Sequence, residues 1–508
     1  MDLKIFDKKI LIMCVVVFIL GLFARIYTIT LKTDFHQDEV LSVILSNYSE
    51  YGWTKLPEKN RVFTGKDIKR MMLWNDSSLK DMFSDIWNLY LYTRDDSHSN
   101  LYYSILRASF AGISDFDIKQ TIYRGCSINL IAYCLSFFFM FKLLALLLKK
   151  QSLIPFGLFV AFMNTGAISN VAYLKPYNLQ EVAFIIVTYY FIRLLRGENL
   201  NFLKPALSIA FAFLSGYYSI IYVGILAVVL FIKNLDKRYL FKIAGLSLIF
   251  TTIFYPGYFL GLISYRATET IERFSGNNLF YSFLGLPYLY LKYIFSLSLI
   301  IYLVYLLVKI SRQKLLVDNE SKDIILLFVI GLVWSAIIMF IAPFKVLRYI
   351  LPVFPILALI IPYIVSYFDK KLLPIIIILG IVCLNFVIAV GFYKNPKIGR
   401  YIPFISNLEF LKNNKTSNYL FKEDLLKPVF IVKPKDENLT IGKVIIFADI
   451  LPYLDNNQQY IFINPNTKIV LNNFYLIYPK SENINSNNDV MINIQNCNSY
   501  YICAEIKR

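Results

Sequence analysis

The sequence has few charged residues and few of the side chains that bind metals. Charged residues make up 17% of the 508 residues, whereas an ordinary soluble domain has about 25%. The chain contains only two histidines, and none of its six cysteines forms a C-x-x-C pair. The composition therefore argues against a soluble enzyme, and the cysteine spacing argues against a zinc-finger type of site.

Hydrophobic residues are abundant instead. They make up 57% of the chain, and the mean hydropathy is +0.54. Several apolar runs reach the length of about 20 residues that a helix needs to cross a bilayer. These features predict an α-helical polytopic membrane protein. The net charge of +18 fits cytoplasmic loops and lipid headgroup contacts, so we expect no nucleic-acid partner.

About eleven spans can be assigned so that the short loops rich in Lys and Arg all lie on the N-terminal side of the membrane, as the positive-inside rule requires. The first span, about 10–31, lacks a small-residue cleavage site, so we expect it to remain uncleaved. The N-terminus is then cytoplasmic and the C-terminus extracytoplasmic. The later spans are expected at about 122–148, 153–169, 177–195, on either side of 215–217, and at 240–262, 288–309, 323–341, 349–367 and 372–392.

A long outer loop, about 32–121, follows the first span. Within it, 101–112 is apolar but only about twelve residues long, which is too short to cross. We expect an interfacial helix there, because counting it as a span would place every later basic loop outside, Lys149-Lys150 included.

The composition changes near residue 393, where Asn, Lys, Asp and Pro become frequent. The change predicts a transmembrane domain over 1–393 and a small α/β or β-rich extracytoplasmic domain over 394–508. An oxidising compartment favours a disulfide between Cys497 and Cys503, although two buried free thiols fit the sequence equally well. Short runs of β-forming residues occur at 428–433, 443–448, 460–463 and 468–471.

Both histidines lie beside carboxylates, in two polar clusters within the outer loop. His36, Asp38 and Glu39 come just after the first span, and Asp96 and His98 precede the next apolar stretch. Alone, each cluster suits a solvated loop or the N-terminal cap of the following helix. The repeated pattern favours a site in which a carboxylate acts as general base towards a hydroxyl. A divalent metal ion remains an alternative, although the spacing matches no metal motif.

Cations are expected on the same outer face. Lys175 and Arg348 lie at outer ends of spans, and Arg266 lies in the loop after the seventh span. Basic residues at such positions most often contact lipid headgroups. A carboxylate base combined with cations that hold a phosphate is, however, what group transfer from a lipid phosphate needs.

Four segments resemble the GT-C fold glycosyltransferases, the polyprenyl-phosphate-sugar-dependent enzymes that include protein O-mannosyltransferases, the aminoarabinose transferases of lipid A and the lipopolysaccharide-core transferases of rhizobia. The Asp-Glu pair after the first helix is the family's most specific mark. Ser99 and Asn100 replace two prolines of the second motif, and Lys175 stands where the family has Arg. The resemblance covers about 9–393, and its segments are 35–42 (FHQDEVLS), 96–103 (DSHSNLYY), 173–179 (YLKPYNL) and 348–355 (RYILPVFP).

The resemblance implies an inverting transfer of a sugar from a polyprenyl-phosphate donor to a hydroxyl of a glycolipid, polysaccharide or protein, at the outer face of the plasma or inner membrane. Asp38 is implied as the catalytic base, with Glu39 and Asp96 as further catalytic carboxylates. Lys175 and Arg348 would hold the lipid phosphate. The other residues expected to bind substrate are His36, His98, Tyr102, Tyr177, Arg266 and Tyr349.

Two other functions stay open. A transporter or flippase for a lipid-linked sugar would place charges near the middle of the membrane and show broken helices in paired halves. Here the charges cluster at the outer ends of the spans, and the two halves of the chain do not match. An O-antigen-type polymerase would more commonly carry its large outer loop late in the chain.

Overall fold

The computed structural model describes most of the chain up to residue 394 and several strands beyond it. Contacts between residues divide the chain into two compact units, of which unit 1 comprises 1–31, 90–102 and 126–408, and unit 2 comprises 32–89, 103–125 and 409–508. The described residues are 7–32, 35–48, 57–58, 60–74, 78–92, 99–233, 236–261, 302–305, 308, 319–342, 347–368, 372–394, 429–432, 451–463, 473–479, 490–496 and 501–507.

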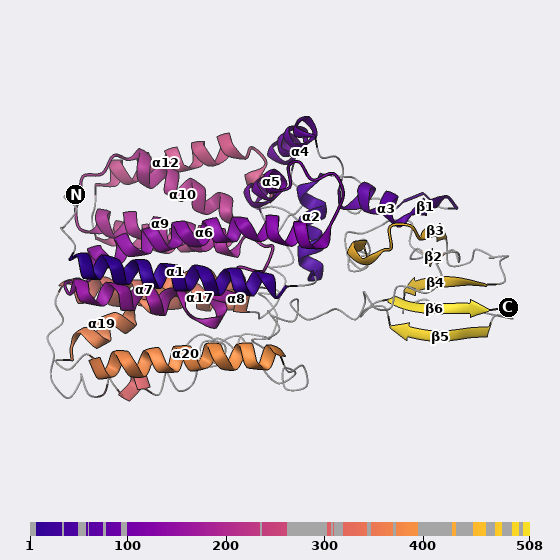
Figure 1. Ribbon diagram of the computed structural model, residues 1–508. Helices are drawn as coiled ribbons and strands as arrows, with labels where there is room; N and C mark the ends of the chain where they lie inside the picture. The colour runs from indigo at the N-terminus through magenta and orange to yellow at the C-terminus, as the bar shows by residue number, and fades with distance from the viewer. Residues whose placement is uncertain are drawn as a thin grey trace. The chain divides into compact units, whose positions relative to one another are not determined.

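Unit 1 is a bundle of helices (Figure 1). Of the described helices, four are long and apolar enough to cross a membrane, so the chain is an integral membrane protein. These are α1 (Lys8–Thr30), α6 (Ile118–Leu147), α9 (Tyr177–Leu195) and α17 (Asn319–Ile341). The unit also contains α10 (Leu203–Ser215), α11 (Tyr218–Ile232), α12 (Lys237–Phe254), α13 (Tyr258–Gly261) and α20 (Leu372–Lys394).

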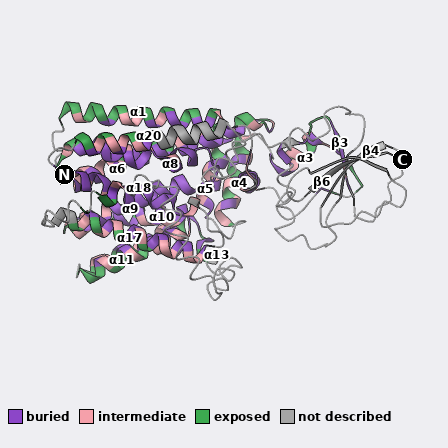
Figure 2. Cartoon of the chain, turned by 90° about the horizontal axis from the view of Figure 1, so that it is seen from below, coloured by how far each residue is buried: buried purple, intermediate pink, exposed green. Residues whose placement is uncertain are grey.

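The bundle is organised around α9, which is buried along nearly its whole length and packs against α10 and α11. Helix α1 packs on one side only, so that much of its surface is exposed (Figure 2). The exposed side chains of α1, such as Ile19 and Phe23, are apolar, as expected for a helix that faces lipid. The number of eleven spans stays a prediction, because most of 288–309 lies outside the described residues.

Three of the predicted spans are not continuous helices. The span at 240–262 is broken between α12, which ends at Phe254, and α13, which begins at Tyr258. The span at 153–169 divides into α7 (Ile154–Phe162) and α8 (Thr165–Asn170), after the short 3-10 turn η1 (Gln151–Leu153). The span at 349–367 is built from η3 (Leu347–Tyr349), η4 (Leu351–Val353), α18 (Phe354–Ala358) and α19 (Ile360–Ser366). Pro352 and Pro355 lie in the first turns of η4 and α18, where the N–H that a proline lacks is not needed.

Unit 2 contains a mixed sheet, with strand order β1-β3-β2-β4-β6-β5 in the described part. Strands β3, β2 and β4 run parallel, and the outer pairs are antiparallel. The edge strand β1 comes from the outer loop, and its Phe63 pairs with Tyr460 of β3. The strands are β1 (Val62–Thr64), β2 (Val429–Val432), β3 (Gln459–Ile463), β4 (Asn473–Pro479), β5 (Val490–Asn496) and β6 (Tyr501–Lys507), with a 3-10 turn η8 (Leu451–Tyr453).

The predicted β runs at 428–433 and 460–463 are confirmed as β2 and β3, whereas 443–448 and 468–471 lie outside the described residues. The sequence analysis did not find β4, β5 or β6. The domain boundary at 393/394 stays a prediction. The proposed disulfide also stays a prediction, because Cys497 lies outside the described residues.

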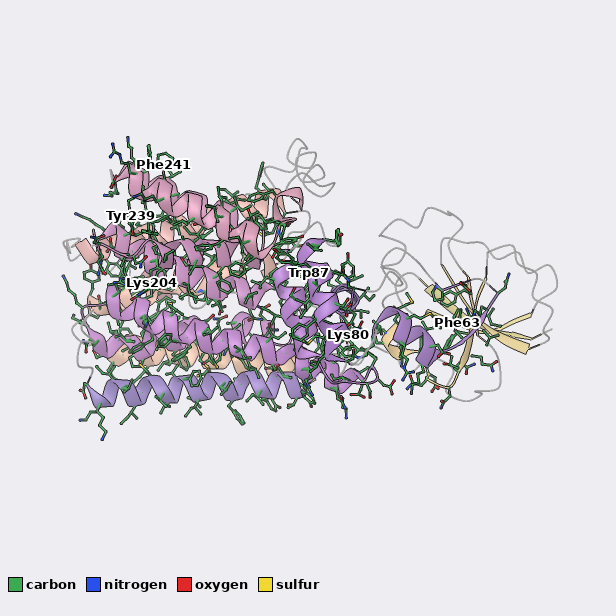
Figure 3. All side chains as sticks on the ribbon, turned by 90° about the horizontal axis from the view of Figure 1, so that it is seen from above. Phe63, Lys80, Trp87, Lys204, Tyr239 and Phe241 are labelled. Atoms are coloured by element: carbon green, nitrogen blue, oxygen red, sulfur yellow. The ribbon has the colours of Figure 1, made fainter. Side chains whose placement is uncertain are left out.

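The outer loop forms α2 (Gln37–Ser46), α3 (Gly65–Met72), α4 (Leu79–Leu91) and α5 (Asn100–Ser109). Helix α5 has 10 residues, so it spans about 15 Å and is too short to cross a bilayer. Its Tyr102, Tyr103 and Leu106 are buried in the protein. Helix α4 instead exposes Leu79, Phe83 and Trp87 along one face, with Lys80 beside them (Figure 3).

Candidate functional site

The acidic pair of the first motif lies at the start of α2, in unit 2. His36 is the N-cap of this helix, and its Nδ1 accepts a hydrogen bond of 3.2 Å from the backbone N–H of Asp38. Glu39 completes a capping box, because its Oε2 accepts a bond of 2.7 Å from the backbone N–H of His36. The interpretation of Asp38 as the helix cap is therefore wrong, since His36 and Glu39 make the cap.

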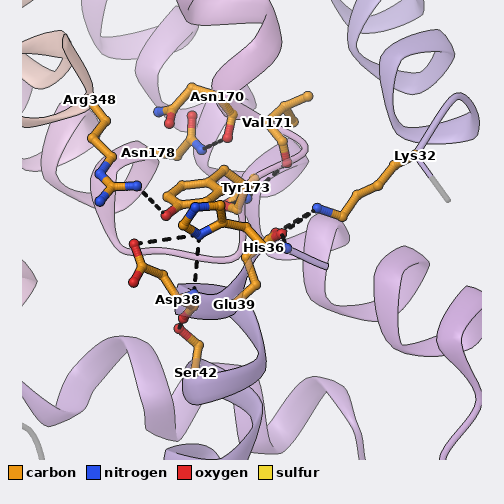
Figure 4. A network of polar contacts seen from close by, with 11 residues as sticks. Lys32, His36, Asp38, Glu39, Ser42, Asn170, Val171, Tyr173, Asn178 and Arg348 are labelled. Atoms are coloured by element: carbon orange, nitrogen blue, oxygen red, sulfur yellow. Dashed lines mark hydrogen bonds and ion pairs between the residues drawn. The ribbon is translucent and has the colours of Figure 1, made fainter. Parts of the chain in front are cut away.

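Glu39 is also one half of a buried ion pair (Figure 4). The ammonium of Lys32 donates to both carboxylate oxygens, at 2.6 and 2.7 Å, and both side chains are 0% exposed. A solvated loop pair is therefore the wrong description for Glu39. Its two oxygens are occupied by the Lys32 ammonium and the His36 amide, which leaves Glu39 poorly suited to bind a metal ion.

Asp38 lies one position earlier and has a different environment. It occupies the first turn of α2, and its side chain is 31% exposed. One carboxylate oxygen lies 3.6 Å from His36 Nδ1. Because this nitrogen accepts the Asp38 amide, it carries no proton in this geometry, and the proton of the neutral imidazole is on Nε2. Asp38 is thus the member of the pair with an accessible carboxylate, on a helix rather than in an exposed loop.

The predicted cations lie in unit 1, where the segment between α8 and α9 carries Lys175. This lysine is only 6% exposed, and its backbone N–H bonds to the Tyr173 carbonyl at 2.8 Å. Among the described residues no carboxylate forms an ion pair with its ammonium. Helix α9 begins two residues later, and its N-cap, Pro176, supplies no side-chain acceptor. A buried lysine therefore directly precedes the N-terminus of a helix, the end at which anions bind in proteins.

Arg348 belongs to the same group (Figure 4). It lies in η3, and its Nη1 donates a hydrogen bond of 2.6 Å to the hydroxyl of Tyr173. The guanidinium carbon is 5.5 Å from the ring centre of Tyr173 and 5.7 Å from that of Tyr349. The rings of Tyr173 and Tyr177 are stacked, with centres 6.2 Å apart and planes inclined by 3°. Arg348 thus lies among tyrosines, whose hydroxyls and faces suit an amphiphilic anion.

The structure brings some of the predicted site residues together within each unit. Lys175, Tyr177, Arg348 and Tyr349 form one group in unit 1 with Tyr173, and His36, Asp38 and Glu39 form another in unit 2 with Lys32. Tyr102 is buried in α5. The predicted residues Asp96, His98 and Arg266 lie outside the described part of the chain.

Two members of these groups were missed by the sequence analysis. Lys32 was treated only as the start of the loop, and Tyr173 only as part of a motif. Neither carries a signal of its own. Lys32 lies before the start of α2 at Gln37, so helical periodicity does not relate it to Glu39. Among the described residues, no group of three or more His, Cys, Asp or Glu side chains is placed to hold a metal ion.

The sequence matches no family model and no curated protein. Two solved structures are similar to it, both of ArnT from Cupriavidus metallidurans. The form bound to undecaprenyl phosphate has a TM-score of 0.51 at 11% identity, and the apo form has 0.51 at 10%. Each similarity covers 97% of this chain and 97% of the solved chain. The chain therefore has the GT-C fold, as the four motif segments led us to expect.

Proposed function

We propose that this chain with the GT-C fold is a membrane glycosyltransferase that moves a sugar from a polyprenyl-phosphate donor to a hydroxyl acceptor on the extracytoplasmic face, with inversion. The solved protein with the similar fold was crystallised with undecaprenyl phosphate, which supports a lipid phosphate of this class as the partner.

The observation that carries the proposal is the buried ammonium of Lys175. Burial of an ionised group is costly unless an opposite charge compensates it. Within the described residues, Lys175 has no carboxylate partner, and the positive end of α9 adds to its field instead of opposing it. A phosphate would supply the missing negative charge. The donor's phosphate and the polyprenyl phosphate that leaves after transfer carry this charge in both states of the reaction.

Arg348 is proposed to hold the same phosphate together with Lys175. Its guanidinium is already fixed by the Tyr173 hydroxyl at 2.6 Å, so little side-chain entropy is lost on binding. In the transfer, the bond between the anomeric carbon and the phosphate oxygen breaks and negative charge grows on the phosphate. Cations fixed at that position stabilise this charge in the transition state.

Asp38 is proposed as the general base. It takes the proton of the acceptor hydroxyl while the hydroxyl oxygen attacks the anomeric carbon from the face opposite the phosphate, which inverts the configuration. Its accessibility distinguishes it from Glu39, whose carboxylate is buried and bonded on both oxygens. In this proposal Glu39 and Lys32 hold the first turn of α2, and with it the Asp38 side chain.

The remaining residues keep the roles implied by the resemblance. His36, with its Nε2 proton, is proposed as a donor to the substrate, and Tyr102, Tyr177 and Tyr349 as substrate contacts. Asp96, His98 and Arg266 stay predictions. The acceptor, whether glycolipid, polysaccharide or protein, and the extracytoplasmic position of the site are also parts of the proposal.

A lipid-linked-sugar transporter is the second candidate, and two observations favour it. The predicted span at 153–169 is broken between α7 and α8, and Arg25 and Glu181 are buried inside unit 1. Broken helices and buried charges are typical of transporters. A transporter needs no general base, so a substitution of Asp38 separates the two functions.

The test is sugar transfer from a polyprenyl-phosphate sugar in membranes, normalised to protein amount, for Asp38→Asn. Loss of a general base costs roughly 10²–10⁴-fold in rate. The unfolding temperature of the variant should change little, because Asn keeps the size and the polar contacts of Asp. The matched control is Asp117→Asn, because Asp117 is an exposed carboxylate that accepts a hydrogen bond from the Gln120 amide at the start of α6, and Asn serves there equally well. Transfer by the Asp38 variant at the rate of the control would remove Asp38 from the mechanism.

A further inference from the structure

The segment that carries Tyr173 and Lys175 follows a break in a membrane helix. Helix α7 ends at Phe162, Asn164 caps α8 through a 2.9 Å bond to the Ala167 amide, and α8 ends at Asn170. The backbone carbonyls from 171 to 175 therefore lie outside a regular helix. Such carbonyls need other donors when they are buried.

Asn129 of α6 supplies two of these bonds. Its side chain is buried, and its amide nitrogen donates to the carbonyls of Val171 at 2.9 Å and Tyr173 at 3.0 Å. An amide nitrogen has two hydrogens, so both are used on this segment. The Tyr173 carbonyl also accepts the Lys175 backbone N–H. The side chain of Asn129 and the backbone N–H of Lys175 thus bond to the same carbonyl, that of Tyr173.

Arg25 of α1 holds the other end of the segment. Its side chain is buried, and its Nη2 donates a 3.0 Å bond to the carbonyl of Phe162, the last residue of α7. Its Nη1 donates to the Gly21 carbonyl at 3.0 Å. The guanidinium carbon lies 3.8 Å from the centre of the Tyr133 ring. The arginine therefore bridges α1, α6 and the break between α7 and α8.

The two ends are coupled through α6. Asn129 and Tyr133 are four residues apart on this helix, so their side chains lie on the same face, one turn from each other. Tyr133 also donates a 3.1 Å bond from its hydroxyl to the Phe18 carbonyl of α1. A Cβ atom at Gly21 would clash with that hydroxyl, so a larger residue there would push the Tyr133 ring away from α1.

We propose that Asn129 and Arg25 are positioning residues that fix the 163–175 segment, and through it Lys175 and Tyr173, for the lipid phosphate. The inference rests on the proposed function, since it assigns these two side chains to the phosphate site. Under this inference, Arg25 and the break between α7 and α8 serve the phosphate site, so neither requires the protein to be a transporter. Neither side chain contacts the phosphate in this account.

The first test is Asn129→Leu, which keeps the approximate volume and removes both donors from two buried carbonyls. The binding of undecaprenyl phosphate to the full-length protein in nanodiscs is expected to weaken roughly 10-fold. Amide hydrogen exchange over 163–177 is expected to become faster, because the segment loses two of its anchors. Arg25→Lys keeps the charge but cannot reach both the Gly21 and the Phe162 carbonyl. It should therefore also weaken lipid-phosphate binding and speed up the exchange. This variant replaces Asn129→Leu if Asn129→Leu does not fold.

The matched control is Thr188→Val. Thr188 is a buried residue of α9 whose hydroxyl bonds to the Phe184 carbonyl and the Tyr222 hydroxyl, both at 2.7 Å. The variant therefore loses buried hydrogen bonds in the same unit, three turns of α9 away from Lys175. It is expected to lower the unfolding temperature without changing lipid-phosphate binding or exchange over 163–177.

The outcomes separate this inference from the proposed function. Weak binding and fast exchange in Asn129→Leu but not in Thr188→Val support the positioning role. Normal binding by Asn129→Leu overturns it if Lys175→Met binds weakly, and leaves the proposed function standing. Equal loss of binding in Asn129→Leu and Thr188→Val also overturns it, because general destabilisation then explains both. Normal binding by Lys175→Met and Asn129→Leu alike would refute the phosphate site and the inference together.

Discussion

Two buried lysines, one in each unit, have opposite electrostatic environments. The ammonium of Lys32 in unit 2 bonds to both oxygens of Glu39, and both side chains are completely buried. Lys175 in unit 1 is buried almost as deeply but has no carboxylate partner among the described residues, and a helix N-terminus follows it. Lys32 is therefore compensated by a carboxylate of the protein, whereas among the described residues no carboxylate compensates Lys175.

In our proposal, the first charge maintains the fold and the second binds a ligand. In unit 2 the pattern of Lys32 is repeated, because Arg107 on α5 is buried and bonds to Asp85 at 2.7 Å and Asp81 at 3.3 Å. These pairs fix α2 and α4. In unit 1 the hydroxyl of Tyr173 bonds to Arg348 and orients its guanidinium.

The largest effect on stability is expected from Lys32→Met. Removal of one partner of a buried pair leaves an uncompensated charge, which typically costs about 3–5 kcal/mol. The double variant Lys32→Met/Glu39→Gln removes both charges but keeps an acceptor for the His36 amide, so most of the stability should return. Thermal unfolding in nanodiscs measures both variants. A single variant as stable as the double one would show that the pair is not a structural element.

A smaller effect is expected from Tyr173→Phe, which tests how the cations are held. The variant removes the hydroxyl that fixes Arg348, and hydrogen bonds to charged groups contribute roughly 1.5–3 kcal/mol. Because water can replace part of this bond, we expect undecaprenyl phosphate to bind about fivefold more weakly. The control is Tyr239→Phe, whose hydroxyl donates to the Leu200 carbonyl away from this group. Equal affinities of the two variants would refute a role of the Tyr173 hydroxyl.

The smallest effect concerns the exposed carboxylate of Asp115 in unit 2. Hydrogen bonds from Lys66 and Arg70 lower its pKa below the ordinary value. A carboxylate whose folded-state pKa is lowered stabilises the protein above the unfolded-state pKa of about 4, and this contribution is lost as the pH falls through the lowered pKa.

Asp115→Asn should therefore reduce the unfolding temperature slightly at pH 7. The difference between the variant and the wild type should vanish in acid, and it should shrink in about 1 M salt, because the pair is exposed. Unfolding curves recorded from pH 7 to pH 2 provide the check. A difference that persists at the lowest pH would assign the effect of the substitution to something other than this ion pair.

The sequence predicts those parts of the fold that depend on local periodicity. Long apolar runs predict α1, α6 and α17, and the β-forming runs predict β2 and β3. The break between α7 and α8 escaped prediction because Met163-Asn164 contains no proline, and Asn164 ends one helix and caps the next only through its side-chain bonds. Strand β1 escaped because three residues carry no measurable period, and it becomes a strand only through pairing with β3.

The site was predictable in its residue types but not in their roles. The Asp-Glu motif pointed to the first turn of α2, yet the sequence could not distinguish an accessible Asp38 from a buried Glu39. That distinction depends on Lys32, which is brought to Glu39 by the fold of the loop. His36 was expected to bind substrate, and its role as the helix cap was missed because histidine is not among the usual capping residues.

The central claim is that Lys175 is a ligand-binding cation, and Lys175→Met tests it most directly. The measurement is the binding of undecaprenyl phosphate to the purified full-length protein, together with its unfolding temperature. We predict a dissociation constant at least about 10-fold higher. The unfolding temperature should be unchanged or raised, because an apolar side chain of similar length needs no partner. An unchanged dissociation constant, or a loss of stability as large as that of Lys32→Met, would contradict the account.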